Sequence, residues 1–188
     1  MGAGSLVGGF ASPASMSARA FRAAMEAMAR PGRIQRIAGA APPAPLSPAA
    51  GALLLTLCDG STPLHLAGDA DSPEVRAWVA FHCGAPLASA QAASFALGAW
   101  DALRPLDRFA TGTPEYPDRS ATLIVEVPDL QPEGARLAGP GIETEARLSL
   151  PEGLAEARAA VLAYPLGLDL FLTAGERLAA LPRSTRVL

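Results

Sequence analysis

The chain has 188 residues, of which half are hydrophobic, 18% are charged and 5% are aromatic. A chain of this length can bury about 70% of its unfolded surface, which is enough for one domain with a proper core. All fifteen basic residues are arginines, and 18 acidic residues bring the net charge to −3. The missing lysine excludes Schiff-base chemistry, and the negative charge argues against a nucleic-acid partner.

The first sixteen residues differ in composition from the rest of the chain. Residues 1–16 are small and rich in Gly and Ser, which predicts a flexible or partner-docked arm ahead of one α/β domain over residues 17–188. Ser17 is placed to cap a helix over residues 17–29. The apolar residues at helical spacing in this segment, which predict its buried face, are Phe21, Met25 and Met28.

Two Ser-Pro pairs predict the starts of the next two helices. Ser47-Pro48 and Ser72-Pro73 each combine a capping residue with proline at the first helical position. Between these helices, residues 62–66 alternate between apolar and polar side chains, which indicates a short strand.

The second half of the chain contains the clearest strand signal. Residues 121–127, ATLIVEV, form an almost continuous apolar run, which predicts a strand buried on both faces and a sheet with helices on either side. Weaker patterns predict strands at 94–97 and 146–150, a helix at 153–163 and a hairpin at 168–181. The fold class that follows is α/β, a single domain with a mixed β-sheet flanked by helices.

Cysteine and histidine are the residues that first point to a catalytic or metal site. Cys58 and His65 are seven residues apart and His65 and His82 seventeen, and neither spacing is typical of structural zinc. His82 and Cys83 are adjacent, so on a helix their side chains point about 100° apart and the pair is poorly placed to act as base and nucleophile. Packing in the core is therefore the favoured interpretation, and we expect neither a metal nor a catalytic residue.

Cysteine usage and hydropathy also bear on location. Two cysteines are too few for a disulfide framework in a chain of this size, which fits a reducing compartment. The longest apolar run covers residues 49–58, about half of a membrane span, and the first basic residue is Arg19. We therefore expect a cytoplasmic protein without a membrane partner.

The most unusual stretch is the polar segment TGTPEYPDRS, residues 111–120, directly before the buried strand. Two prolines restrict its backbone, which lowers the entropic cost of holding polar groups in place. Loops anchored by a rigid sheet often carry binding residues, although the same charges could simply tie the loop down. The candidate binding residues in this segment are Glu115, Tyr116, Asp118 and Arg119.

The C-terminal segment LPRSTRVL places two arginines around two hydroxyl groups. Arginine presents a planar fork of donors that suits phosphate or phosphonate oxygens, and hydroxyls add further donors. An arginine-bearing end that is merely solvated is the alternative. The candidates here are Arg183, Ser184, Thr185 and Arg186, to which Arg22 and Arg30 of the first helix are added as possible anion donors.

Five segments, in chain order, together resemble one known family: AFRAAMEAMARPGRI (20–34), LLLTLCDGSTPLHLAG (53–68), TGTPEYPDRSATLIVEV (111–127), GPGI (139–142) and YPLGLDLFLTAGERLAALPRSTRVL (164–188). The family that they resemble is PhnH, whose members are subunits of the bacterial carbon–phosphorus lyase core complex. The resemblance extends over about residues 10–188 and is loose only in the stretch 35–50.

The resemblance implies a part in organophosphonate breakdown. Together with sister subunits, the family couples an alkylphosphonate to the ribose C1 of ATP, with loss of adenine, and yields a ribose 1-phosphonate 5-triphosphate. It also implies a homodimer within a larger assembly, and a fold similar to pyridoxal-phosphate-dependent transferases without use of that cofactor. The absence of lysine agrees with the last point.

Three functional hypotheses follow. The leading one is a non-autonomous subunit of the carbon–phosphorus lyase core complex that is inactive alone and has neither pyridoxal phosphate nor a metal of its own. The alternative is a stand-alone binder of a phosphorylated or nucleotide ligand through an arginine-lined pocket. The least favoured is an independent enzyme that uses Cys83 or His82. The residues expected to line the arginine pocket are Arg22, Arg30, Arg119, Arg183 and Arg186, oriented by Tyr116 and Asp118.

Overall fold

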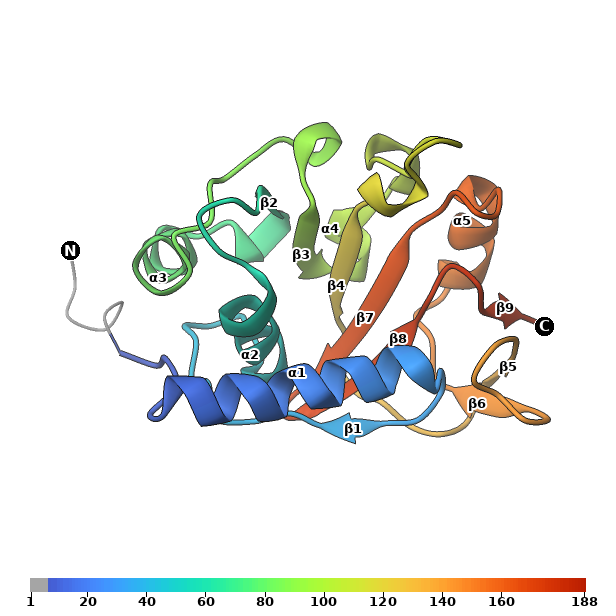
Figure 1. Ribbon diagram of the computed structural model, residues 1–188, viewed down its shortest axis with the longest axis horizontal. Helices are drawn as coiled ribbons and strands as arrows, with labels where there is room; N and C mark the ends of the chain where they lie inside the picture. The colour runs from blue at the N-terminus through green and yellow to red at the C-terminus, as the bar shows by residue number, and fades with distance from the viewer. Residues whose placement is uncertain (1–6) are drawn as a thin grey trace.

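A six-stranded mixed β-sheet lies at the centre of the protein, and helices cover both of its faces (Figure 1). The computed structural model describes residues 7–188 of the chain. The strands of this sheet are β1 (Gln35–Arg36), β2 (Leu64–Leu66), β3 (Phe95–Ala99), β4 (Thr122–Glu126), β7 (Asp169–Ala174) and β8 (Arg177–Leu181). They lie in the order β1-β8-β7-β4-β3-β2, in which β2, β3, β4 and β7 are parallel and β8 and β1 continue the sheet antiparallel.

Strand β4 shows why the sheet is covered on both faces. Leu123 and Val125 belong to one hydrophobic core and Ile124 belongs to the other, and all three side chains are fully buried. Successive side chains of a strand point to opposite faces, so a strand without polar residues in its centre needs a layer on each side. The predicted α/β class, with a mixed sheet flanked by helices, is confirmed.

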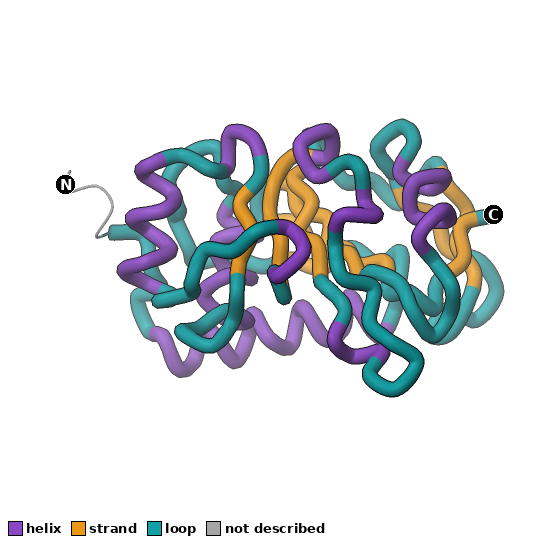
Figure 2. Tube along the Cα trace, turned by 90° about the horizontal axis from the view of Figure 1, so that it is seen from above, coloured by secondary structure: helices purple, strands orange, loops and turns teal. Residues whose placement is uncertain are grey.

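The two helical layers differ in composition. Helices α1 (Pro13–Ala29), α2 (Pro48–Leu57) and α3 (Pro73–His82) contribute buried residues to one core. Helices α4 (Trp100–Leu103) and α5 (Leu154–Val161) belong to the other core, together with the antiparallel sheet of β5 (Ala135–Ala138), β6 (Ala146–Leu148) and β9 (Arg186–Val187). Seen from above, the strands lie between these layers (Figure 2). Short 3-10 helices connect the longer elements: η2 (Gly68–Ala70), η3 (Ala90–Ala92), η4 (Leu106–Arg108) and η5 (Pro117–Arg119).

Both predicted helix caps are confirmed. The hydroxyl of Ser47 accepts a hydrogen bond from the backbone N–H of Ala50 at 3.1 Å, and that of Ser72 accepts one from Val75 at 3.2 Å. Each bond satisfies a backbone donor that a helix start otherwise leaves unpaired. The predicted C-terminal hairpin is also present, since β7 and β8 pair antiparallel around a turn at Gly175.

The prediction for the start of the first helix is wrong by four residues. Helix α1 begins at Pro13 with Ser12 at the capping position, and Ser17 lies inside the helix. Proline fits the first turn of a helix because its missing N–H would be unpaired there in any case. Residues 13–16 therefore belong to α1 and not to an arm, while residues 1–6 lie outside the described part of the chain.

The predicted apolar face of α1 is also mostly wrong. The buried residues of this helix are Ala20, Ala24 and Ala27, whereas Phe21 and Met25 are 50% and 54% exposed. Helix α1 packs against α2 and β8, and small side chains allow backbones to approach closely at such a contact. The large apolar residues are left on the outer side, and among the expected three only Met28 packs against the core.

Short strands without an alternating pattern escaped prediction. These strands are β1, β5 and β9, each two to four residues long. Strand β9 lies within the C-terminal segment and pairs with β5, so the chain end is part of a small sheet. Within residues 7–188, no helix is both long enough and apolar enough to cross a bilayer.

Candidate functional site

The polar segment 111–120 forms a closed loop at the start of β4. Thr111 and Ser120 form an isolated antiparallel bridge at its base, and the N–H of Ala121 donates to the carbonyl of Ala110 at 2.8 Å. Gly112 has φ +86°, and a Cβ at this position would lie 2.8 Å from the Pro117 carbonyl oxygen. Only glycine tolerates both this backbone conformation and so close an approach. Gly112 therefore allows the loop to close tightly.

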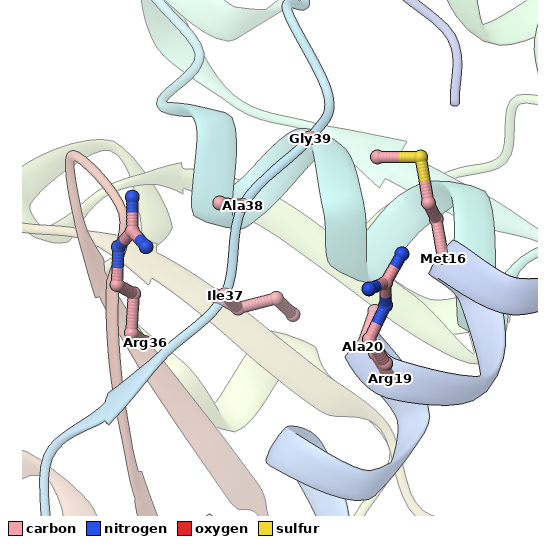
Figure 3. A pocket seen from close by; sticks show the side chains of 7 residues that line it. All are labelled: Met16, Arg19, Ala20, Arg36, Ile37, Ala38 and Gly39. Atoms are coloured by element: carbon pink, nitrogen blue, oxygen red, sulfur yellow. The ribbon is translucent and has the colours of Figure 1, made fainter. Parts of the chain in front are cut away.

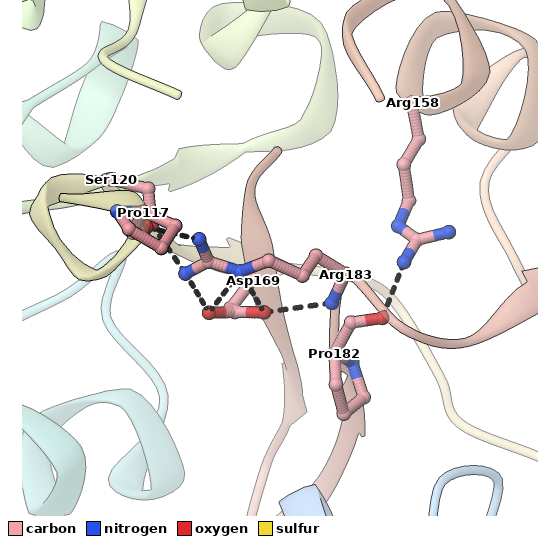
Figure 4. A network of polar contacts seen from close by, with 6 residues as sticks. All are labelled: Pro117, Ser120, Arg158, Asp169, Pro182 and Arg183. Carbon is pink, nitrogen blue, oxygen red and sulfur yellow. Dashed lines mark hydrogen bonds and ion pairs between the residues drawn. The ribbon is translucent and has the colours of Figure 1, made fainter. Parts of the chain in front are cut away.

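Arg183 fastens this loop to the sheet (Figure 4). Its backbone N–H donates to Asp169 Oδ1 at 2.7 Å, and its guanidinium Nε and Nη2 contact the same carboxylate at 3.2 Å and 2.5 Å. The same guanidinium donates to the carbonyl of Pro117 and the hydroxyl of Ser120. Every guanidinium nitrogen of Arg183 therefore has a partner within the chain, which ties η5 to the first residue of β7 and the end of β8.

Arg158 binds the segment that follows β8 in the same region. It lies on α5, is 3% exposed, and donates to the carbonyl of Thr185 at 2.7 Å and to the carbonyl of Pro182. Burial lowers the pKa of its guanidinium, and the nearby negative charge of Asp169 opposes that effect. Sequence reasoning missed Arg158; the available signal was its position four residues after Leu154, on the buried side of a short helix.

The structure brings together part of the predicted site. Asp118, Arg183 and Ser184 line one shallow cavity of about 330 Å³ together with Tyr164. The guanidinium carbon of Arg119 lies 4.0 Å from the centre of the Tyr116 ring, so these two exposed side chains form a cation–π pair beside it. Glu115 is exposed on the same loop.

The other predicted residues lie elsewhere. Arg22 is on α1 and Arg30 caps the end of this helix, where it pairs with Glu26 at 3.3 Å; helix α1 lies away from the loop 111–120 in Figure 1. Thr185 is fully buried, so its hydroxyl does not reach solvent. Arg186 belongs to β9 and is exposed. The predicted set is therefore divided between a loop network, a helix surface and a strand of the small sheet.

The two thiols are poorly suited to nucleophilic chemistry. Burial raises the pKa of Cys58 to about 12, with smaller contributions from Cys83 and Asp59, and burial raises the pKa of Cys83 to about 11. The thiolate is the reactive form, and it is scarce at neutral pH at both positions. In residues 7–188 no three Cys, His, Asp or Glu side chains are grouped to hold a metal ion.

A larger cleft of about 790 Å³ lies at the opposite end of the parallel strands. At its edge the Glu126 carboxylate, on the last residue of β4, accepts hydrogen bonds from the N–H of Ser47 at 2.6 Å and from the Thr173 hydroxyl at 2.9 Å. Burial raises the pKa of Glu126, and these hydrogen bonds partly oppose the increase. Sequence reasoning missed this cleft because its walls come from distant segments. The charged residues that line it are Asp101, Arg104, Glu126, Asp129 and Glu152.

Fold and site together define a layered α/β protein whose polar loop is fixed by internal arginine contacts and whose described thiols are not activated. Residues 8–188 match the family model described as "Bacterial phosphonate metabolism protein (PhnH)", and the chain belongs to this family. It is 44% identical over 150 residues, 74% of this chain and 73% of the relative, to "Alpha-D-ribose 1-methylphosphonate 5-triphosphate synthase subunit PhnH" of Rhizobium meliloti (strain 1021). It is 34% identical over 153 residues, again 74% of this chain and 73% of the relative, to "Putative C-P lyase subunit protein HtxG" of Stutzerimonas stutzeri.

Proposed function

We propose that the chain is a non-autonomous subunit of a carbon–phosphorus lyase core complex. In this complex it supports the coupling of an alkylphosphonate to the ribose C1 of ATP with loss of adenine, which yields a ribose 1-phosphonate 5-triphosphate. The observation that carries the proposal is the family match over residues 8–188, with 44% identity to a relative named as a subunit of a ribose 1-methylphosphonate 5-triphosphate synthase.

The geometry of the site favours a subunit that acts within a complex over an enzyme that is active alone. Both thiols have raised pKa values, and every guanidinium nitrogen of Arg183, the central arginine of the loop network, has a partner within the chain. The chain has no lysine to bind pyridoxal phosphate covalently, so its residues do not fit that cofactor. We infer that the groups that act on the substrate come from sister subunits, and that this subunit has no cofactor or metal of its own. The likeness to pyridoxal-phosphate-dependent transferases remains a prediction.

The loop 111–120 has the features of a surface that contacts a sister subunit. Tyr116 and Arg119 are stacked and exposed on a loop that the Arg183 network holds rigid. Tyrosine and arginine are enriched in protein interfaces, and a pre-organised loop loses little entropy on binding. We infer assembly with sister subunits through this loop, a homodimer through another surface, and a cytoplasmic location without nucleic-acid or membrane partners.

Substitution of Arg119 tests the assembly. Arg119→Ala removes the exposed half of the stack, and we expect a lower yield of sister subunits when the tagged chain is purified from cells that express the whole complex. Arg104→Ala is a matched control, because Arg104 is also exposed and its guanidinium lies 5.8 Å from the centre of an aromatic ring, that of Trp100, at the other end of the parallel strands. Equal yields for the two variants and the wild type would contradict the assignment of this loop.

An activity measurement tests the lack of autonomy. The purified chain, mixed with ATP and methylphosphonate, is expected to release no adenine, whereas the reconstituted complex releases it. Steady adenine release by the chain alone would overturn the proposal.

A further inference from the structure

Positive charge is concentrated at one end of the sequence. Residues 7–58 contain five arginines and a single acidic residue, Glu26, although the chain as a whole is acidic. These residues include α1 and β1, which lie along the same side of the molecule in Figure 1. A local excess of one charge on an oppositely charged protein attracts ligands of the opposite sign, here anions.

A pocket of about 370 Å³ lies within this basic region, between α1 and the segment that leaves β1. Figure 3 shows Arg19 and Arg36 on either side of the segment 37–39, with their guanidinium groups extended in the same direction. This volume is in the range of small-ligand sites. The lining residues are Met16, Arg19, Ala20, Arg36, Ile37, Ala38 and Gly39.

Arg36 is held in place by one carboxylate and keeps donors free. Its Nε and Nη2 both donate to Glu176 Oε2, at 3.0 Å and 2.6 Å, which leaves Nη1 without a partner among the described residues. The backbone of Glu176 is held next to β1, because its main-chain carbonyl accepts the N–H of Ile37 at 2.8 Å. The pair therefore orients the guanidinium of Arg36 beside the pocket without using all of its hydrogen-bonding capacity.

Arg19 has no such partner. Among residues 7–188, no carboxylate lies within ion-pair distance of its guanidinium. Two guanidinium groups thus flank one pocket with only one carboxylate to neutralise them. An oxyanion between them would neutralise the remaining positive charge and accept from planar donor forks, the geometry that arginine offers to phosphate-like groups.

The other walls of the pocket limit what else a ligand carries. Ile37 and Ala20 are buried and form an apolar base. Gly39 has φ +101°, and a Cβ there would lie 2.0 Å from the Met16 methyl carbon, so the thioether packs directly against the glycine and closes one side. The space next to the arginines therefore suits a compact apolar group.

We propose that this pocket binds a small phosphate or phosphonate, with its tetrahedral oxyanion between Arg19 and Arg36 and a short apolar substituent on Ile37. The cleft near Glu126 does not compete for such a ligand, because four of the five charged residues that line it are acidic. This pocket is not the arginine-lined pocket expected from the sequence, because neither Arg19 nor Arg36 was among the residues expected to line that one. It stands independently of the proposed subunit role: a chain that assembles normally but binds no oxyanion would retain that role and lose this site.

Calorimetric titration of the full chain with inorganic phosphate and with methylphosphonate tests the site. Arg19→Gln and Arg36→Gln each remove charged donors, and we expect each to weaken binding at least about tenfold, the effect of losing one charge-assisted hydrogen bond. Arg33→Gln is the matched control, since it removes the same charge from an exposed residue of the same region that does not line the pocket. All three side chains are exposed, and circular dichroism checks that the variants stay folded.

Each outcome of these titrations bears on the proposal. Tighter binding of methylphosphonate than of phosphate supports the apolar base as well as the oxyanion contacts and points to a phosphonate ligand. Equal affinities that both fall in Arg19→Gln and Arg36→Gln support the oxyanion site, point to free phosphate, and refute the role of Ile37. No binding by the wild type would overturn the site. Equal weakening by Arg33→Gln would overturn it as well, because the binding would then come from general electrostatic attraction to the basic region.

Discussion

The two ends of the neighbouring strands β4 and β7 hold their carboxylates in opposite ways. At the start of β7, Asp169 is paired with the guanidinium of Arg183, which also binds the loop before β4. At the end of β4, Glu126 is held only by neutral donors, the N–H of Ser47 and the hydroxyl of Thr173. The first end is a compensated charge pair, and the second is a desolvated carboxylate with a raised pKa beside a cleft.

This difference shows that the residue type alone does not reveal the role of a charged side chain. Arg183 and Arg36 both contact a carboxylate, yet Arg183 also binds two groups of a loop and is largely buried, whereas Arg36 is mostly exposed and keeps a free donor. An arginine whose three guanidinium nitrogens all have partners within the chain, such as Arg183, stabilises the fold. An arginine with a nitrogen that has no such partner, such as Arg36, is the one available to a ligand or a partner.

The largest expected effect comes from breaking the charge pair. Arg183→Met leaves Asp169 mostly buried without a counter-charge and frees the loop 117–120, so the free energy of unfolding should fall by about 3 kcal/mol. Urea denaturation followed by circular dichroism measures it. Arg119→Met on the same loop is the control and should cost below about 1 kcal/mol, because its contact with Tyr116 is exposed. Similar losses for both variants would show that the pair does not anchor the loop.

Arg158 is expected to give the next largest effect at the same end of the sheet. Arg158→Met leaves the carbonyls of Pro182 and Thr185 without this donor, but it also removes a desolvated charge, and we expect a net loss of about 2 kcal/mol. The same urea denaturation measures it, with Arg147→Met, which loses only an exposed ion pair to Glu145, as control. A more stable Arg158→Met protein would mean that the cost of burying the charge exceeds the value of its hydrogen bonds.

The fold could be predicted from the sequence where a local signal and the tertiary environment agree. The apolar run that forms β4 and the capping serines Ser47 and Ser72 act within a few residues, so they were identified correctly. The apolar face of α1 was not, because its orientation depends on a close contact with α2 and β8 that favours alanine over Phe21 and Met25. Helical spacing gives the period of a face but not the neighbour that it meets.

The candidate site was predicted less completely for a related reason. The loop 111–120 stands out in the sequence because prolines and charges are concentrated there, and the structure shows a loop that is closed at its base and hydrogen-bonded to Arg183 at the start of β4. The partners of its residues are far away in the chain, as with Arg183 and Asp169, and no spacing rule connects them. The same holds for Arg19 and Arg36, which only the pairing of β1 with β8 brings to one pocket.

The smallest effect, and the one that sharpens the comparison of the two strand ends, is the pH dependence of Glu126. Because burial raises its pKa in the folded state, the folded protein holds this proton more tightly than the unfolded chain does. The contribution of Glu126 to stability is therefore fully present below the ordinary pKa of glutamate, about 4.3, and is lost as the pH rises through the raised value.

Glu126→Gln removes this titration and keeps the contacts, since the amide oxygen can accept from the Ser47 N–H and the amide nitrogen can donate to the Thr173 hydroxyl. We expect the variant to gain stability relative to the wild type as the pH rises above the ordinary pKa of glutamate, about 4.3, as urea denaturation at each pH would show. Subtracting the two proteins cancels carboxylates whose pKa is lowered, such as Asp71 and Asp129, which contribute equally to both. A difference that stays constant with pH would show that the pKa of Glu126 is the same in the folded protein and in the unfolded chain, and the contrast with Asp169 would then disappear.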